Sequence, residues 1–276
     1  MSARIFVGSE RLGGLAAGDR GWTYGDALFE TLRVCHGRIH WWAAHWQRLT
    51  RGAQRLGIPL PDQALVLGEV SDLVGGEDGV LRLQVSRGVG GRGYAPPDEA
   101  VPGWTIALHP LPPVAPPDGI ELRWCETRLS LQPALAGIKH CNRLEHVLAR
   151  AEWTPHTAAH EGLMRSTEGD VVCATAANVF VLSGNGWLTP AIDRCGVRGI
   201  CRDWAVGALG AREGRLDVTV VEAAEAVFVC NAVRGILPVA RLGDRIWRPH
   251  PQLAALHQRL ANEHPGFARS SAPSSE

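Results

Sequence analysis

Residues 135–145 read Leu-Ala-Gly-Ile-Lys-His-Cys-Asn-Arg-Leu-Glu, and they contain the only lysine of the chain, Lys139. Lysine and arginine together number 28, so the other 27 basic residues are arginines. Arginine can replace lysine as a surface charge, but its guanidinium stays protonated and cannot serve as an amine nucleophile. The single lysine therefore predicts either an amine with a chemical role or a surface lysine that substitution has spared.

The residues that follow Lys139 predict a helix from Asn142 to Trp153. Its apolar side chains recur at helical spacing and are expected to face inward; they are Leu144, Val147, Leu148 and Ala151. Lys139 would then project from a loop or strand end beside packed elements. Such a position desolvates an amine and lowers its pKa, as covalent amine chemistry requires.

A proline-rich stretch divides the chain, with five prolines between His109 and Asp118. Neither a helix nor a central strand accommodates that density of proline, so the stretch is predicted to be an extended connector. We expect an N-terminal domain over 1–112, a connector over 113–118, a C-terminal domain over 119–267 and a disordered tail over 268–276. The tail is rich in serine and proline.

Hydrophobic periodicity gives a mixture of strands and helices on both sides of the connector. Strands are expected near 28–34, 81–85, 104–108, 120–124, 178–182, 218–221 and 226–230, and helices near 42–56, 62–74 and 252–262. Strands and helices do not alternate regularly. The predicted fold class is therefore α/β of the mixed α+β kind, in two domains.

Composition limits the classes of partner and compartment. The 276 residues are 45% hydrophobic and carry 28 acidic against 28 basic side chains, which argues against nucleic-acid binding. No long apolar run or secretory leader is evident, so no membrane partner is expected. The seven cysteines include no C-x-x-C pair, so neither disulfides nor a metal site is predicted. These features favour a reduced, cytoplasmic protein.

Four further places in the sequence could hold an anion or a substrate. Arg48 could clamp a phosphate with its guanidinium, or face solvent on its helix. The turns at 195–199 and 230–235 offer free backbone N–H groups to a phosphate, or are ordinary turns. The glycine-rich segment 88–94 lacks the lysine of a P-loop, and it could be a flexible loop or a loop that covers a substrate.

Taken together, these segments resemble the class IV aminotransferase family, the type IV fold of pyridoxal-phosphate enzymes. The resemblance runs from about Asp19 to Val239. It is carried by the segments at 19–33, 45–49, 86–94, 125–130, 135–145, 176–180 and 230–239. It implies two α/β domains of the D-amino-acid aminotransferase-like kind, with pyridoxal 5'-phosphate between them, in a homodimer.

The resemblance also implies roles for individual residues. Lys139 matches the lysine that binds the cofactor covalently and acts in catalysis, and Arg48 matches the arginine that binds its phosphate. The turns that wrap the phosphate correspond to Val197 and Arg198 and to Asn231 and Ala232.

One position departs from the family pattern. Relatives usually carry a glutamate five residues before Asn178, paired with the pyridine nitrogen of the cofactor, and this chain has Cys173 there. A carboxylate keeps that nitrogen protonated, whereas a neutral thiol holds the proton poorly. We expect Cys173 to weaken the ring as an electron sink and to disfavour transamination.

The segments Gly-Ile-Lys-His-x-Asn-Arg-Leu and Asn-Ala-Val-Arg-Gly favour the lyase branch of the family over its transaminases. The implied reaction is elimination of an enolpyruvyl group from a cyclic amine with two carboxylates. Arg92, Tyr94 and Arg234 are the expected substrate-binding residues. The alternatives are a transaminase of D- or branched-chain amino acids and a pyridoxal-phosphate-binding protein without turnover.

Overall fold

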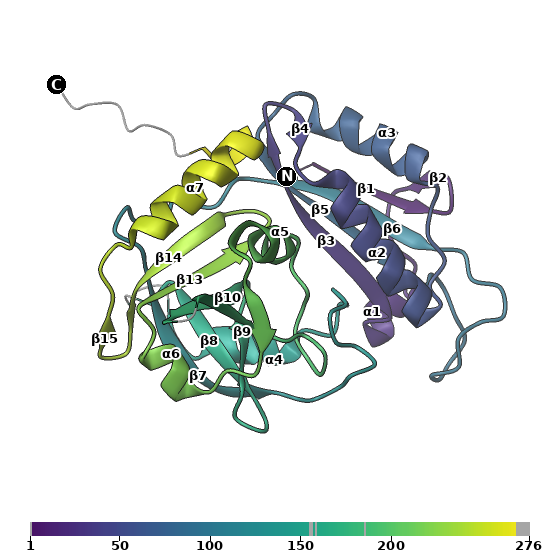
Figure 1. Ribbon diagram of the computed structural model, residues 1–276. Helices are drawn as coiled ribbons and strands as arrows, with labels where there is room; N and C mark the ends of the chain where they lie inside the picture. The colour runs from purple at the N-terminus through teal and green to yellow at the C-terminus, as the bar shows by residue number, and fades with distance from the viewer. Residues whose placement is uncertain (1, 155–156, 158, 185, 269–276) are drawn as a thin grey trace.

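The first half of the chain forms a six-stranded antiparallel sheet in the order β2-β1-β6-β5-β3-β4 (Figure 1). The computed structural model describes residues 2–154, 157, 159–184 and 186–268. The strands are β1 (Ser2–Val7), β2 (Glu10–Leu12), β3 (Ala27–Cys35), β4 (Arg38–Ile39), β5 (Gly79–Ser86) and β6 (Gly103–His109). The helices of this half are α1 (Arg20–Tyr24), α2 (Trp42–Leu56) and α3 (Gln63–Val74).

Strand β3 separates the core of this half from the site described below. Its residues alternate in burial, because successive side chains of a strand point to opposite faces. Leu28, Leu32 and Val34 pack against α2 and α3 in the first hydrophobic core. Phe29 and Thr31 point the other way, toward the second half of the chain.

The second half forms a nine-stranded sheet in the order β12-β11-β10-β13-β14-β7-β8-β9, with β15 paired to β14. Its strands are β7 (Ile120–Leu129), β8 (Glu161–Ser166), β9 (Val171–Ala174), β10 (Asn178–Ser183), β11 (Gly186–Pro190), β12 (Arg212–Gly214), β13 (Ala226–Asn231), β14 (Gly235–Leu242) and β15 (Arg245–Ile246). Its helices are α4 (Leu144–Ala151), α5 (Ile200–Leu209), α6 (Val218–Glu222) and α7 (Pro251–Glu263), and a 3-10 turn spans Pro265–Phe267.

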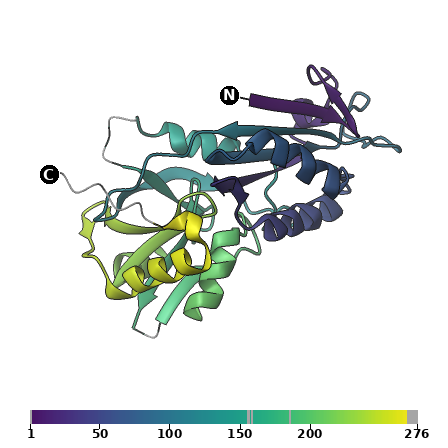
Figure 2. The ribbon, with the colours of Figure 1, turned by 90° about the horizontal axis from the view of Figure 1, so that it is seen from above.

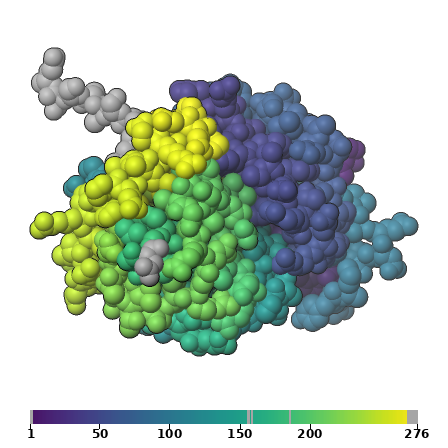
Figure 3. All heavy atoms as spheres, in the orientation of Figure 1, coloured from purple at the N-terminus to yellow at the C-terminus, as the bar shows by residue number. Residues whose placement is uncertain are grey.

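This sheet curls so that β9, at its end, comes back into contact with β10. The curl encloses one apolar cluster, which includes Val179, Val229 and Leu163. A second cluster fills the space between the sheet and helices α5 and α7. Seen from above, the two halves lie side by side (Figure 2), and in the space-filling view they are packed directly together (Figure 3).

The two sheets are joined by residues 110–118, which contain no helix or strand. This segment coincides with the proline-rich stretch, where a missing N–H and a fixed φ oppose regular structure. Of the tail predicted to be disordered, 269–276 lies outside the described residues. Among the described helices, none combines the length and the apolar character needed to cross a membrane.

Two details of the predicted elements are wrong. Residues 218–221 form the short helix α6 rather than a strand, because the Asp217 side chain caps it by accepting from the N–H of Val220. Helix α4 does exist, but its predicted inner face is largely exposed. Leu144 is 76%, Val147 59% and Leu148 61% exposed, Ala151 is exposed as well, and only Ala149 is buried.

Candidate active site

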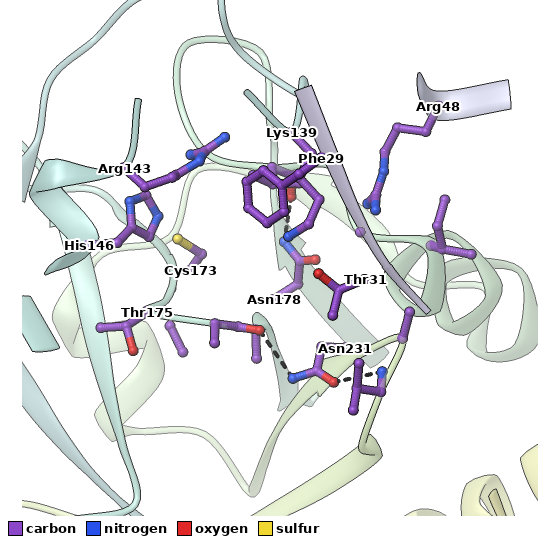
Figure 4. A pocket seen from close by; sticks show the side chains of 18 residues that line it. Phe29, Thr31, Arg48, Lys139, Arg143, His146, Cys173, Thr175, Asn178 and Asn231 are labelled. Carbon is purple, nitrogen blue, oxygen red and sulfur yellow. Dashed lines mark hydrogen bonds between the residues drawn. The ribbon is translucent and has the colours of Figure 1, made fainter. Parts of the chain in front are cut away.

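A cavity of about 360 Å³ lies between β3 of the first sheet and the curled second sheet (Figure 4). Its walls come from β3, the 139–146 segment, the 173–178 segment, the start of α5 and the β13–β14 turn. The lining side chains include Lys139, Arg48, Cys173, Asn178 and Asn231. Residues that are far apart in the sequence therefore converge on one cavity of the size that small-molecule sites have.

Lys139 enters this cavity from a segment bound to β3. The N–H of Phe29 donates to the carbonyl of Lys139 at 3.0 Å, and the Lys139 Nζ lies 4.2 Å from the centre of the Phe29 ring. Burial lowers the pKa of Lys139 to about 7, and the nearby Arg48 guanidinium acts in the same direction. The amine is thus neutral for much of the time near neutral pH, the state in which it is nucleophilic and basic.

Arg48 reaches the cavity from α2 and is only 7% exposed. Its Nε donates to Glu30 Oε1 at 2.9 Å, its Nη2 donates to Glu30 Oε2, and its Nη1 donates to the carbonyl of Arg198 at 2.9 Å. The guanidinium is therefore fixed in orientation. Its remaining donors are available to an anion in the cavity.

The sequence patterns did not single out the group that holds Arg48. Glu30 is 1% exposed and also lies 2.6 Å from His45 Nδ1. Burial alone would raise the pKa of Glu30, but Arg48 and His45 lower it to about 2. One signal in the sequence points to Glu30. Its neighbours two positions away in β3, Leu28 and Leu32, are apolar and face the core. A carboxylate on such a face must pair with a buried cation.

Two backbone segments complete this end of the cavity. Gly199 precedes α5 and approaches Asn178 so closely that an added Cβ would lie 2.2 Å from Asn178 Oδ1. Asn178 Nδ2 in turn donates to the carbonyl of Val197 at 2.9 Å. The first N–H groups of a helix have no partner within it, so the start of α5 beside Arg48 suits an anion.

The second backbone segment is the β13–β14 turn. Asn231 Oδ1 accepts from the N–H groups of Val233 at 3.0 Å and Arg234 at 2.8 Å. Its Nδ2 donates to the carbonyl of Ala176 at 3.1 Å. These bonds fix the turn, and they place Asn231, Ala232 and Val233 in the cavity wall.

The structure thus brings together most of the residues expected to bind the cofactor: Arg48, Lys139, Cys173, Val197, Asn231 and Ala232. Arg198 was expected to offer its backbone N–H to the phosphate, but this N–H donates to the carbonyl of Gly137 at 3.2 Å. The carbonyl of Arg198 instead helps to hold Arg48 by accepting from its Nη1. Lining residues that the sequence did not single out are Phe29, Thr31, Arg143 and His146.

The three residues expected to bind the substrate do not line this cavity in the single chain. Tyr94 is 87% exposed and Arg92 is exposed beside it. The guanidinium of Arg20 binds the carbonyls of Gly93, Tyr94 and Ala95 and so holds this loop against the first sheet. Arg234 turns away toward the connector, where its Nη2 donates to the carbonyl of Pro113 at 3.3 Å.

A cluster of possible metal ligands also lies outside the cavity, although the sequence predicted no metal site. One ligand atom from each of Cys35, His36 and Asp78 lies within 4.8 Å of the others. Asp78 Oδ1 also accepts from the N–H of His36 at 2.5 Å. That contact secures the β3–β4 turn, where His36 has a φ of 49°.

The donors around the cavity have the chemistry that pyridoxal phosphate requires. An amine of lowered pKa, a fixed guanidinium and a helix start surround one cavity, and these are the partners that an aldehyde and a neighbouring phosphate require. The residues present fit the group. Lys139 would bind its aldehyde, and Arg48 with the start of α5 would bind its phosphate.

Comparisons with known proteins identify the family of the chain. The sequence model of the amino-transferase class IV family matches residues 27–242. The aminodeoxychorismate lyase of Vibrio harveyi is 34% identical over 81% of this chain and 85% of its own. The crystal structure of 4-amino-4-deoxychorismate lyase from Pseudomonas aeruginosa is 36% identical, with a TM-score of 0.88 over 94% of this chain and 99% of that one.

A second similar structure belongs to a transaminase. The branched-chain amino acid aminotransferase from Escherichia coli has a TM-score of 0.82 at 20% identity, and the similarity covers 98% of this chain and 97% of that one. At that identity the similarity shows a shared fold only.

Proposed function

Because the chain belongs to the class IV aminotransferase family, we propose that it is a lyase that converts 4-amino-4-deoxychorismate into 4-aminobenzoate and pyruvate. Its similarity to two such lyases, at 34% and 36% identity over most of the chain, carries the proposal. The buried amine of Lys139 supports it chemically. Since 4-aminobenzoate is a building block of folate, we assign the reaction to folate biosynthesis.

Pyridoxal 5'-phosphate is the proposed cofactor. When bound, it supplies an aldehyde that binds the substrate amine and a conjugated ring that withdraws electrons from the adjacent carbon. The first role of the chain is to orient the cofactor. Arg48 and the start of α5 would hold its phosphate, and Lys139 would hold its aldehyde. A fixed cofactor keeps the reacting carbon within reach of the same lysine.

Lys139 is the proposed general base, and its amine is free for this role once the substrate amine has replaced it at the aldehyde. With a pKa of about 7, its Nζ is neutral often enough to accept the proton from the substrate carbon that bears the amine. The C–H electron pair forms the new ring double bond, and the enolpyruvyl oxygen leaves the neighbouring carbon with the C–O electron pair. The ring becomes aromatic, and the released enol becomes pyruvate when a proton adds to its methylene carbon.

The experiment that tests this proposal is the lyase assay with purified protein and added pyridoxal phosphate. Release of 4-aminobenzoate and pyruvate in equal amounts is the expected result, and Lys139→Arg should abolish it because a guanidinium cannot replace the amine. A parallel incubation with an amino acid and a 2-oxo acid tests the transaminase alternative. Cofactor binding with neither activity would instead favour a protein without turnover.

We further propose that the protein acts as a homodimer. The exposed apolar face of α4, formed by Leu144, Val147 and Leu148, supports this, because a helix face of that kind gains stability when another surface covers it. Light scattering should give about twice the 29.7 kDa of one chain. A mass of one chain at assay concentration would contradict the proposal.

The proposed compartment is the cytoplasm, and the proposed ligand is a small molecule only. All seven cysteines are free thiols, which suits a reducing compartment. The balanced net charge of the chain argues against nucleic acid as a partner.

A further inference from the structure

The wall of the cavity opposite Arg48 carries a positive charge, that of Arg143, and, among its described residues, no carboxylate. Figure 4 shows Cys173, Arg143 and His146 together on this wall, with Arg48 on the other side and Lys139 between them. The cavity is lined by two guanidinium groups, those of Arg48 and Arg143, and by the amine of Lys139, and no described lining residue carries a carboxylate. The charge of this wall decides whether the pyridine ring of a bound cofactor carries a proton on its nitrogen.

The shape of pyridoxal phosphate indicates which atom meets this wall; this step rests on the proposed function. The ring nitrogen lies across the ring from the carbon that bears the aldehyde, and the phosphate arm is attached beside that carbon. With the aldehyde at Lys139 and the phosphate at Arg48, the ring nitrogen points away from both. It therefore faces the wall of Cys173, Arg143 and His146.

None of these three groups can act as a counter-ion to a protonated ring nitrogen. Cys173 is 4% exposed, and burial raises the pKa of its thiol to about 12, so it stays neutral. Burial, with Arg143 beside it, lowers the pKa of His146 to about 4, so the imidazole is neutral as well.

Arg143 is positively charged and held in place. Its Nη2 donates to the carbonyl of Ile138 at 2.9 Å and its Nε to the carbonyl of His140 at 3.0 Å. A second cation close to a fixed guanidinium in a desolvated site is disfavoured. Arg143 therefore opposes a proton on the ring nitrogen.

Two carboxylates, Glu161 and Glu145, act electrostatically on Cys173 and Arg143 respectively, but both are engaged elsewhere. Glu161 accepts from Thr175 Oγ1 and from the N–H of Gly162, and burial raises its pKa. Glu145 accepts from the N–H of Ser130 at 2.8 Å. Neither side chain lines the cavity.

We propose that the wall formed by Cys173 and Arg143 keeps the ring nitrogen of bound pyridoxal phosphate unprotonated, and that this restricts the protein to elimination. An unprotonated ring stores a pair of electrons poorly. In the elimination, the pair from the broken C–H bond passes at once into the new double bond while the C–O pair leaves with the enolpyruvyl group. Transamination has no leaving group, so it depends on the ring to hold that pair.

The test is ¹⁵N NMR of the full-length protein loaded with pyridoxal phosphate that carries ¹⁵N in its ring. The resonance of a neutral pyridine is well separated from that of a pyridinium ion. The expected result is the neutral position throughout the neutral pH range. A pyridinium resonance from an active lyase would overturn this inference alone, whereas a neutral resonance without lyase turnover would overturn the proposed function and leave only the unprotonated ring nitrogen standing.

Cys173→Glu and Cys173→Gln form a matched pair of equal size that differ in charge. Cys173→Glu should move the resonance to the pyridinium position and give measurable transamination, and Cys173→Gln should leave it neutral. Arg143→Gln provides a second route that does not add a side chain to the cavity: the pH midpoint of the ring resonance should rise. If both Cys173→Glu and Arg143→Gln bind the cofactor and leave the resonance unchanged, the wall does not control the nitrogen.

Discussion

Replacing Lys139 by methionine should stabilise the protein without its cofactor, although it removes the proposed catalytic amine. Methionine has a similar length and no charge, so it fills the same space. The amine lies in a cavity with the guanidinium of Arg48 close by, and burial lowers its pKa from an ordinary value of 10.5 to about 7. Keeping this amine protonated in the folded state is therefore unfavourable.

The sign and size of the effect follow from proton linkage. Between pH values of about 7 and about 10.5 the unfolded chain binds a proton at Lys139 that the folded chain has released, so this group makes stability rise with pH by about 1.4 kcal/mol per pH unit. Over an interval of about 3.5 pH units, the destabilisation near neutral pH is at most about 5 kcal/mol. Lys139→Met removes it, so the variant should gain most near neutral pH and nothing near pH 10.5.

Urea unfolding of both cofactor-free proteins across this pH range measures the difference directly. The cysteines and other titrating groups are common to both proteins, so their contributions cancel. Arg51→Met, on the exposed face of α2, makes the same change from cation to methionine in solvent and should show no such pH dependence. A stability difference for Lys139→Met that stays constant with pH would refute a lowered pKa at this lysine.

Three further predictions concern the same network. Arg48→Lys keeps a cation beside Glu30 but loses the two-pronged donor, so cofactor affinity in equilibrium dialysis should fall by about 10-fold or more, whereas Arg51→Lys should leave it unchanged. Glu30→Gln should destabilise the protein by about 3 kcal/mol, because it leaves Arg48 buried without its counter-charge. Since the folded pKa of Glu30 is about 2 against an ordinary 4.5, its stabilisation is present above pH 4.5 and is lost as the pH falls toward 2; acid unfolding of Glu30→Gln should lack this loss. Borohydride reduction of the loaded protein should label Lys139 alone, and a label on any peptide without this residue would contradict its assignment.

The sequence was sufficient to predict elements whose pattern has one physical origin. The alternation in β3 reflects a strand with one face on the core, and the structure has it over Ala27–Cys35. The helical spacing after Asn142 was equally clear, yet the expected inner face of α4 is exposed. Periodicity shows that a face is apolar, but it does not show whether the same chain or another molecule covers it. For α6, the capping of Asp217 prevailed over the strand preference of its valines.

The candidate site was predictable only in part, for a similar reason. Lys139 could be found by counting, because no other lysine competes for the role. Arg143 could not, because 27 arginines look alike in the sequence, and only the fold brings this one to the cavity wall. Arg92 and Arg234 are expected at the substrate because its two carboxylates require arginines. Backbone carbonyl contacts decide their position: Arg20 holds the loop that carries Arg92, and Pro113 binds Arg234.

The charges of the cavity explain why one ligand can complete it. Glu30 balances Arg48 from behind, with His45 sharing the carboxylate, and the lining itself adds Lys139 and Arg143 without any acid among its described residues. A phosphate between Arg48 and the start of α5 would supply negative charge to this lining, and an aldehyde would occupy the amine of Lys139. A ligand that binds only the folded state stabilises that state. The uncompensated positive charge of the lining destabilises the folded protein without its cofactor, so cofactor binding and folding reinforce each other. The guanidinium of Arg143 still faces the ring nitrogen when the cofactor is bound.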